Sequence, residues 1–146
     1  MKLSTKSIYG LRAMLHLALS QKEGVVMSRG IAESANLPET YLEQLMLALR
    51  KAGLLTALRG SRGGYMLARP AESISLAQIV EALEGAIKIV NCADVPNCCN
   101  AQVCALQEVF AEVNKALYTA FDGVTLAELA DRQREKDADA APMYYI

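Results

Sequence analysis

Histidine is almost absent from this sequence of 146 residues, and the residue sets of common enzyme sites are missing with it. The single histidine, His16, has no partner in the sequence, and no pair of acidic residues marks a catalytic cleft. The glycine-rich run at 59–64 lacks the Gly-Lys-Ser/Thr ending of a phosphate-binding loop, and no helix pattern follows it immediately. We therefore predict that the chain is not an enzyme and interpret His16 as a structural residue.

Long apolar runs are also missing. No run approaches the roughly 18 residues of a membrane span, and the first residues lack the apolar centre of a signal peptide. We therefore expect a cytoplasmic protein of one domain that does not bind membranes. Thiols stay reduced in that compartment, so clustered cysteines favour metal binding or redox sensing over structural disulfides.

The net charge of −1 conceals an uneven distribution along the chain. Residues 1–70 contain ten Lys/Arg and four Asp/Glu, which gives +6, whereas residues 71–146 contain five Lys/Arg and twelve Asp/Glu, which gives −7. A basic half is the electrostatic signature of a polyanionic partner such as nucleic acid. The acidic half is interpreted as solvated surface rather than as a second binding site.

The first half of the chain has the periodicity of three helices. Apolar spacing predicts helices over about 5–21, 29–35 and 38–52. Ser4 and Ser28 precede the first two of these helices and are predicted to cap them. The second and third helices are joined by a short turn, which gives the dimensions of a helix-turn-helix.

The third predicted helix has two different faces. Its apolar stripe consists of Leu42, Leu45, Met46 and Leu49, and the other side carries Thr40, Glu43, Gln44 and Lys51. Such a helix either rests on its domain and offers its polar face to a DNA groove, or is an ordinary amphipathic helix with a solvated face. The helix alone leaves both interpretations open.

The following segment favours DNA binding. A strand over 54–58, a basic glycine-rich turn over 59–64 and a returning strand over 65–68 form a predicted hairpin. Glycines permit the positive φ angles of a hairpin tip, and Arg59 and Arg62 suit contact with phosphates or a narrow minor groove. The predicted fold is therefore mostly α with a small β-hairpin, a winged helix-turn-helix over residues 1–84 followed by a long dimerisation helix.

The second half is predicted to contain a helix over 73–84, a cysteine loop over 85–104 and dimerisation helices over 105–135. The last of these helices spans about 125–134, and residues 136–146 are assigned to a C-terminal tail whose first part is a solvated linker. The long helix carries apolar residues in alternating steps of three and four, as in a coiled coil, at Val103, Leu106, Phe110, Val113, Leu117 and Ala120. We prefer self-association to an ordinary core as the use of this seam.

All four cysteines lie within one short segment, at Cys92, Cys98, Cys99 and Cys104. Three of them are separated by five residues each, and thiolates are the usual ligands of iron–sulfur clusters. A metal-free thiol switch is an alternative, because neighbouring exposed thiols oxidise readily. Zinc is a weaker alternative, since only Cys99 and Cys104 have a zinc-like spacing and no further pair completes the site.

Taken together, these segments resemble the family of bacterial winged-helix regulators that includes IscR, NsrR and CymR. The matching stretches are residues 1–12, 41–45, 49–54, 59–65 and 125–129, and the likeness covers nearly the whole chain. The resemblance implies a homodimer on a roughly palindromic double-stranded DNA operator. On this basis we assign DNA contacts to Lys2, Ser28, Thr40, Tyr41, Glu43, Gln44, Arg50, Lys51, Arg59, Ser61, Arg62 and Gly63.

The resemblance also implies an iron–sulfur cluster, because many members of the family hold one on three cysteines spaced like Cys92, Cys98 and Cys104. A [2Fe–2S] cluster is favoured slightly over a [4Fe–4S] cluster. Gln107 occupies the position of a histidine ligand in IscR-like members, and Ile8 the position of an aspartate ligand from the other subunit in NsrR-like members.

The fourth ligand is therefore open. The candidates are Cys99, Asp94, Glu108 or a small exogenous ligand, and Cys99 is chemically the best of them. Adjacent residues of an extended segment point apart, so Cys99 requires a bent backbone to share a cluster with its neighbour.

The last residues carry a secondary hypothesis. Their sequence resembles the ending of CymR and the isoleucine-terminated tails with which serine acetyltransferase enters cysteine synthase. A terminal carboxylate behind an apolar side chain is a recognised binding mode, so Tyr145 and Ile146 are candidate contacts with cysteine synthase. The alternatives are a tail that packs on its own dimer or stays disordered. The chain would then be either a cluster-controlled or thiol-controlled regulator, or an interaction module of cysteine metabolism.

Overall fold

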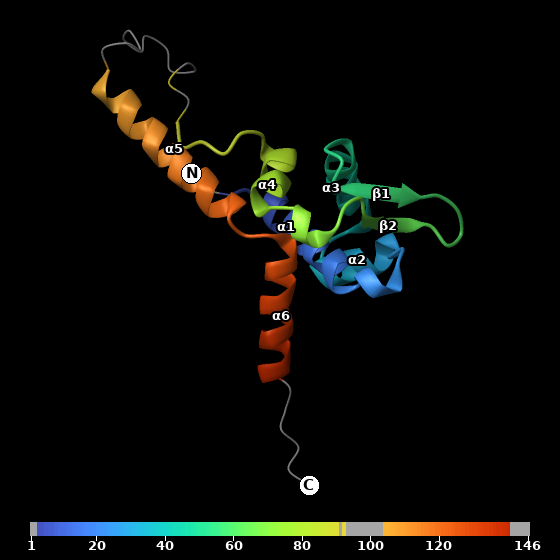
Figure 1. Ribbon diagram of the computed structural model, residues 1–146. Helices are drawn as coiled ribbons and strands as arrows, with labels where there is room; N and C mark the ends of the chain where they lie inside the picture. Colours follow the sequence, from blue (N-terminus) through green and yellow to red (C-terminus); the bar gives the residue numbers. More distant parts are fainter. Residues whose placement is uncertain (1–2, 91, 93–103, 141–146) are drawn as a thin grey trace.

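The computed structural model describes residues 3–90, 92 and 104–140. The elements are α1 (Thr5–Leu19), η1 (Gln21–Glu23), α2 (Ser28–Ala35), α3 (Glu39–Lys51), β1 (Leu55–Leu58), β2 (Gly64–Leu67), η2 (Ala71–Ser73), α4 (Leu76–Glu84), α5 (Ala105–Asp122) and α6 (Leu126–Ala140). Helices α1 to α4 and the β1–β2 hairpin gather in one body, from which α5 and α6 extend in different directions (Figure 1). The prediction of a mostly helical winged helix with one small hairpin is confirmed.

The hydrophobic core lies around α1 and is built from both ends of the chain. Its largest fully buried side chains are Met14, Leu17, Ile31, Leu42, Leu45, Met46, Leu49, Leu54, Leu55, Ile74, Ile79 and Leu126. All four residues of the predicted stripe on α3 are among them. Leu126 of α6 joins the same core although it lies far along the chain, so α6 completes the body that α1 begins.

The beginning of α1 is tied to the end of α4. Ser4 caps α1 as predicted, with its Oγ accepting from Ser7 N. The backbone N and the hydroxyl of Ser4 donate to Glu84 Oε1 at 2.8 and 2.7 Å, and Lys6 Nζ donates to Leu83 O at 2.6 Å. Ser7, whose hydroxyl is buried nearby, and then Ser4 lower the pKa of Glu84 below its usual value. Only Ser4 lies at hydrogen-bonding distance and angle from the Glu84 carboxylate, because Ser7 Oγ forms no hydrogen bond to any described residue.

Two helix starts differ from the prediction. Helix α2 begins at Ser28 itself, because the carbonyl of Met27 accepts the first helical hydrogen bond from Ile31 N, so Ser28 is not the cap. Helix α4 begins at Leu76, later than predicted, because Ser75 and Gln78 form a reciprocal capping box. A short 3₁₀ turn occupies the residues before it.

Helix α6 contradicts the predicted linker, because it continues past residue 134 to Ala140. The Nε2 of Gln133 donates to Asp137 Oδ1 at 2.8 Å, which bridges successive turns across the expected helix end. Four of the six residues over 135–140 are strong helix formers, namely two alanines, one glutamate and one lysine, against two aspartates. The boundary between dimerisation helices and tail, predicted at 135/136, thus falls inside a helix.

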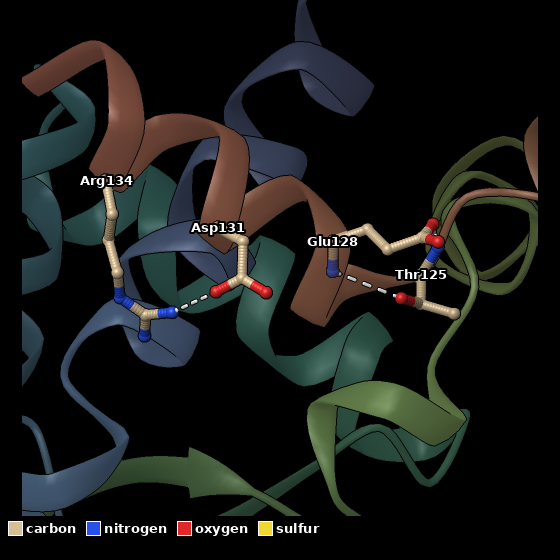
Figure 2. A network of polar contacts seen from close by, with 4 residues as sticks. All are labelled: Thr125, Glu128, Asp131 and Arg134. Atoms are coloured by element: carbon tan, nitrogen blue, oxygen red, sulfur yellow. Dashed lines mark hydrogen bonds and ion pairs between the residues drawn. The ribbon is translucent and has the colours of Figure 1, made fainter. Parts of the chain in front are cut away.

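The start of α6 has a clear local cause. Thr125 N donates to Glu128 Oε2 and Glu128 N donates to Thr125 Oγ1, both at 3.1 Å. This reciprocal cap and the ion pair between Asp131 and Arg134 follow one another along the helix (Figure 2). The N–H of Leu126 also donates to Ile74 O at 2.8 Å, so the cap is fixed against the body of the molecule.

Helix α5 contains no buried residue. Near its C-terminal end, Leu117 and Phe121 pack on a small cluster of Ala77, Val80 and Ile87. Elsewhere along the helix Phe110 and Val113 are half-buried, whereas Leu106 and Val109 are 62% and 52% exposed. Within the described part of the chain, no helix has both the length and the apolar character needed to cross a bilayer.

Candidate nucleic-acid interface and thiol segment

The turn between α2 and α3 has a defined geometry. Asn36 ends α2 in the left-handed conformation with φ of 56°, where asparagine is tolerated. The N–H of Leu37 donates to Ala32 O at 3.0 Å, and Tyr41 N donates to Pro38 O at 3.1 Å. These bonds fix α3 relative to α2, as a helix-turn-helix requires.

Tyr41 is half-buried and lies on the inner side of this arrangement. Its ring meets the ring of Tyr9 edge-on, with centroids 6.1 Å apart and an interplanar angle of 85°. Edge-on aromatic pairs are favourable because of their quadrupoles. The predicted DNA contact at Tyr41 therefore coincides with a residue that anchors α3 to α1.

The outer side of α3 faces a shallow hollow shared with the hairpin. Its lining consists of Thr40, Glu43, Gln44, Leu47 and Arg50 of α3 together with Tyr65 of β2. Of the predicted contacts on α3, Thr40, Glu43, Gln44 and Arg50 are thus brought together, whereas the half-buried Tyr41 and the exposed Lys51 lie outside the hollow. Ser28 is half-buried at the start of α2.

Two residues of this hollow were missed by sequence reasoning, Leu47 and Tyr65. Leu47 departs from the spacing of the buried stripe on α3, and an apolar residue off the stripe is the signal that identifies it. Burial raises the pKa of the Tyr65 phenol, the carboxylate of Glu43 raises it further, and Arg50 opposes the shift. Charged groups of α3 therefore lie close to the hairpin tyrosine.

The predicted wing is formed by β1, β2 and their turn. Leu58 pairs with Gly64 at the end of the antiparallel register. Gly60 has φ of 112°, and Gly63 N donates to Gly60 O at 2.9 Å. A Cβ on Gly63 would lie 2.4 Å from Leu58 O, so only glycine allows this tight turn.

The turn exposes the predicted wing contacts Arg59, Ser61 and Arg62, whereas Gly63 is half-buried. The hairpin is anchored to the start of α2 by a pair of backbone hydrogen bonds, from Val26 N to Tyr65 O at 2.9 Å and from Tyr65 N to Val26 O at 2.8 Å. The wing is thus held in a fixed position beside α3.

The thiol segment begins and ends on described residues. Cys92 and Cys104 are both free and half-buried, and Cys104 is the N-cap residue of α5. The other sequence-predicted residues Lys2, Cys98, Cys99, Tyr145 and Ile146 lie outside the described residues, as does Asp94. Among the residues that are described, no three His, Cys, Asp or Glu side chains are grouped as metal ligands.

Asn114 of α5 holds the chain that leads into this segment. Its Oδ1 accepts from Ile89 N at 2.7 Å, and its Nδ2 donates to Val90 O at 3.1 Å. Ile87, just before, is buried against α4. The backbone two residues before Cys92 is therefore attached to the middle of the helix that starts after Cys104.

Gln107 lies one turn after Cys104, and its N–H donates to Cys104 O at 3.0 Å. Its Oε1 is buried but forms no hydrogen bond to any described residue. Such an atom normally has a partner, because burying an unpaired polar group is costly. Cys92 and Cys104 supply two of the thiols that a thiolate-held group needs, and the unsatisfied amide oxygen of Gln107 lies one helical turn from Cys104, whereas Glu108 is exposed.

A helix-turn-helix whose second helix presents polar side chains beside a basic glycine-rich wing defines a winged-helix DNA-binding protein. Residues 3–132 match the Rrf2 family, described as iron-dependent transcriptional regulators, and the chain belongs to this family.

The relatives are transcriptional regulators, which agrees with the prediction that the chain is not an enzyme. The chain is 37% identical over 149 residues to the regulator CymR of Bacillus subtilis (strain 168), covering 100% of both chains. The solved structure of CymR (YrzC), named there the global cysteine regulator of B. subtilis, has a TM-score of 0.77 at 37% identity and covers 90% of this chain and 98% of that one. The structure of T. potens IscR has a TM-score of 0.74 at 37% identity, and the match covers 99% of this chain and 97% of that one.

Proposed function

We propose that this Rrf2-family regulator acts as a homodimer on a roughly palindromic operator, with an affinity set by an iron–sulfur cluster on Cys92, Cys98 and Cys104. The observation that carries the proposal is the attachment of the Cys92 lead-in to α5 through Asn114. It links the thiol segment to the helix expected to join two subunits.

The charge of the first half and the hollow on α3 support DNA as the partner. Residues 1–70 have a charge of +6, and the exposed wing carries Arg59 and Arg62. Two recognition helices of a dimer must meet half-sites about 34 Å apart, or one duplex turn. Fluorescence anisotropy on selected duplexes tests this, with affinity expected to fall by a log–log slope of about −0.9 per phosphate contact as salt rises. Binding of equal strength to any sequence would contradict the operator.

The open surface of α5 supports the dimer. The helix has no buried residue among its 18 although Leu117 and Phe121 pack on its own chain, and Leu106 and Val109 offer an apolar strip to a second copy. Burying such a strip against its own equivalent is the usual way in which a twofold interface forms.

The thiol segment would control the angle between α5 and the body. When bound, an iron–sulfur cluster supplies iron–thiolate bonds that join the ends of the segment. Cys104 is the N-cap of α5, Asn114 fixes the lead-in to Cys92, and Gln107 has a buried, unpartnered amide oxygen one turn after Cys104. A change at the thiols therefore acts on the same helix from both sides. A coupling of about 1–3 kcal/mol between cluster and operator is typical of allosteric control.

The test is an anaerobic preparation with visible absorption and a count of iron and acid-labile sulfide per chain. Two of each would indicate a [2Fe–2S] cluster and four of each a [4Fe–4S] cluster. A Cys99→Ala variant then examines the fourth ligand. A colourless protein that takes up no iron on reconstitution would contradict the cluster.

A metal-free thiol switch is the second candidate, because Cys92 and Cys104 are free and half-buried. Oxidation would join two thiols as a disulfide and pass two electrons and two protons to a peroxide. DNA affinity that changes with peroxide and recovers with dithiothreitol in iron-free protein would favour this candidate.

We also propose that Tyr145 and Ile146 contact cysteine synthase, because a terminal carboxylate behind an apolar side chain is a recognised binding mode. A pull-down with the wild-type chain and an Ile146 deletion tests it, and equal recovery of the enzyme would contradict it.

A further inference from the structure

Leu47 is an apolar residue on a surface that is otherwise polar. It lies on α3 and is 43% exposed, whereas the four stripe residues of the same helix are buried at 0–1%. Its neighbours in the hollow are Thr40, Glu43, Gln44 and Arg50. An exposed leucine at the centre of a binding face contributes once a partner removes it from water.

The position of Leu47 along α3 defines what it meets. Glu43 and Gln44 precede it by one helical turn, and Arg50 follows it by nearly one turn. All four side chains line the same hollow. A helix that lays these polar groups on the edges of base pairs therefore places Leu47 against the base pair between them.

The chemistry of the major groove then limits the choice. Each base pair presents donors and acceptors there, and the C5-methyl of thymine is the apolar group among them. A leucine side chain has no donor or acceptor, so its favourable contact in that groove is the methyl. Carboxamide and guanidinium groups such as those of Gln44 and Arg50 contact adenine and guanine edges.

We propose that Leu47 is a specificity-determining residue that recognises the C5-methyl of a thymine in each operator half-site. The proposal rests on the proposed DNA-binding function and adds a base to it. Tyr65 of the wing borders the same hollow from β2, so Leu47 belongs to a surface that α3 and the hairpin form together.

The experiment starts from full-length chain and a random duplex pool, from which bound sequences are selected. Each thymine of the selected half-site is then replaced by deoxyuridine, which removes only the methyl. Burying one methyl-sized group changes a binding constant about fourfold, so at one position the wild-type affinity is expected to fall by about that factor. The Leu47→Ala variant is expected to bind the thymine and uracil duplexes equally.

Two controls separate this contact from general effects. Leu47→Met keeps an apolar side chain and is expected to retain the thymine preference. Met66→Ala removes a similarly exposed side chain of the hairpin, 40% exposed and outside the hollow, and is expected to retain it too. Circular dichroism of each variant checks that α3 is still folded.

Two results overturn the proposal: no thymine of the half-site is sensitive to loss of its methyl, or Leu47→Ala keeps the wild-type sensitivity. Failure of the proposed function looks different. In that case the wild-type chain enriches no sequence from the pool, and both proposals fall together.

Discussion

Helices α3 and α5 have a similar sequence pattern and different surroundings. Both carry apolar residues at helical spacing with polar residues on the other side. On α3 the stripe is fully buried in the hydrophobic core, whereas α5 has no buried residue along its whole length. Periodicity therefore predicts a helix and its apolar stripe, but which element buries that stripe depends on the rest of the chain or on a second chain.

The largest contrast is expected from the same substitution on each helix. Leu45→Asp places a carboxylate at a site on α3 that is 1% exposed. Burying an unpaired charge costs several kcal/mol out of a total stability of about 5–15 kcal/mol. We expect loss of the folded state, measured as loss of a cooperative unfolding transition by circular dichroism. A folded Leu45→Asp chain would contradict the described core.

On α5 the change Leu106→Asp is expected to leave each chain folded and to separate the proposed dimer. Two carboxylates facing one another across a twofold seam cost several kcal/mol, so the dissociation constant is expected to rise more than about a hundredfold. Light scattering after size exclusion measures this. Glu108→Gln, at an exposed position of the same helix, is the control and should remain dimeric. An unfolded Leu106→Asp chain would mean that α5 is covered within its own subunit.

A third difference concerns Asn114, which gives α5 its only side-chain hydrogen bonds to the lead-in segment among the described residues. Asn114→Ala removes two bonds, together worth about 1–3 kcal/mol. The segment before Cys92 should then open, so alkylation of Cys92 is expected to accelerate severalfold. Mass spectrometry of alkylated peptides measures the rate, with Cys104 as the internal reference.

Asn114→Asp is the matched control for that experiment. It keeps an acceptor for Ile89 N and loses the donor to Val90 O, so an intermediate rate is expected. Identical rates in the wild-type chain and in Asn114→Ala would show that the side chain does not hold the segment.

The smallest effect is expected at the contact between α1 and α4. The pKa of Glu84 is lowered in the folded chain, so the ionised carboxylate stabilises the fold. This stabilisation is fully present above the ordinary value of 4.5 and is lost as pH falls through the lower folded pKa. Because Glu84 is exposed, the effect is small. In the wild-type chain the free energy of unfolding should decrease below pH 4.5, and this decrease should be smaller in Glu84→Gln, as measured by urea titration at several pH values. The same pH dependence in both chains would contradict a role for the Glu84 carboxylate.

Much of the winged body could be predicted from sequence, because its signals are local. The stripe of α3, the Asn36 break and the glycine turn each determine their own backbone. The errors also have local causes. Ser28 is not the cap because the carbonyl of Met27 accepts the first helical hydrogen bond. The predicted linker is helical because four of the six residues over 135–140 are strong helix formers and Gln133 bonds to Asp137 across the expected helix end.

The candidate site was less accessible from sequence where it depends on long-range contacts. The hollow forms because Tyr65 of the hairpin lies near α3. Leu47 is recognised as part of a binding surface only when this contact between distant residues is known. The hydrogen bonds of Asn114 to Ile89 and Val90 span 25 and 24 positions of the sequence. No periodicity reports such contacts, because they depend on how α4 and α5 are placed after folding.

The return of α6 to the body has a consequence for protein synthesis. Leu126 and Ala130 belong to the same core as Met14 and Leu45, so a ribosome must translate the thiol segment and all of α5 before that core has its full set of residues. Chains fold in part as they emerge, yet a nascent or truncated product that ends before Leu126 lacks a buried wall of the DNA-binding body. The cell thus cannot make a complete DNA-binding body without also making the thiol segment.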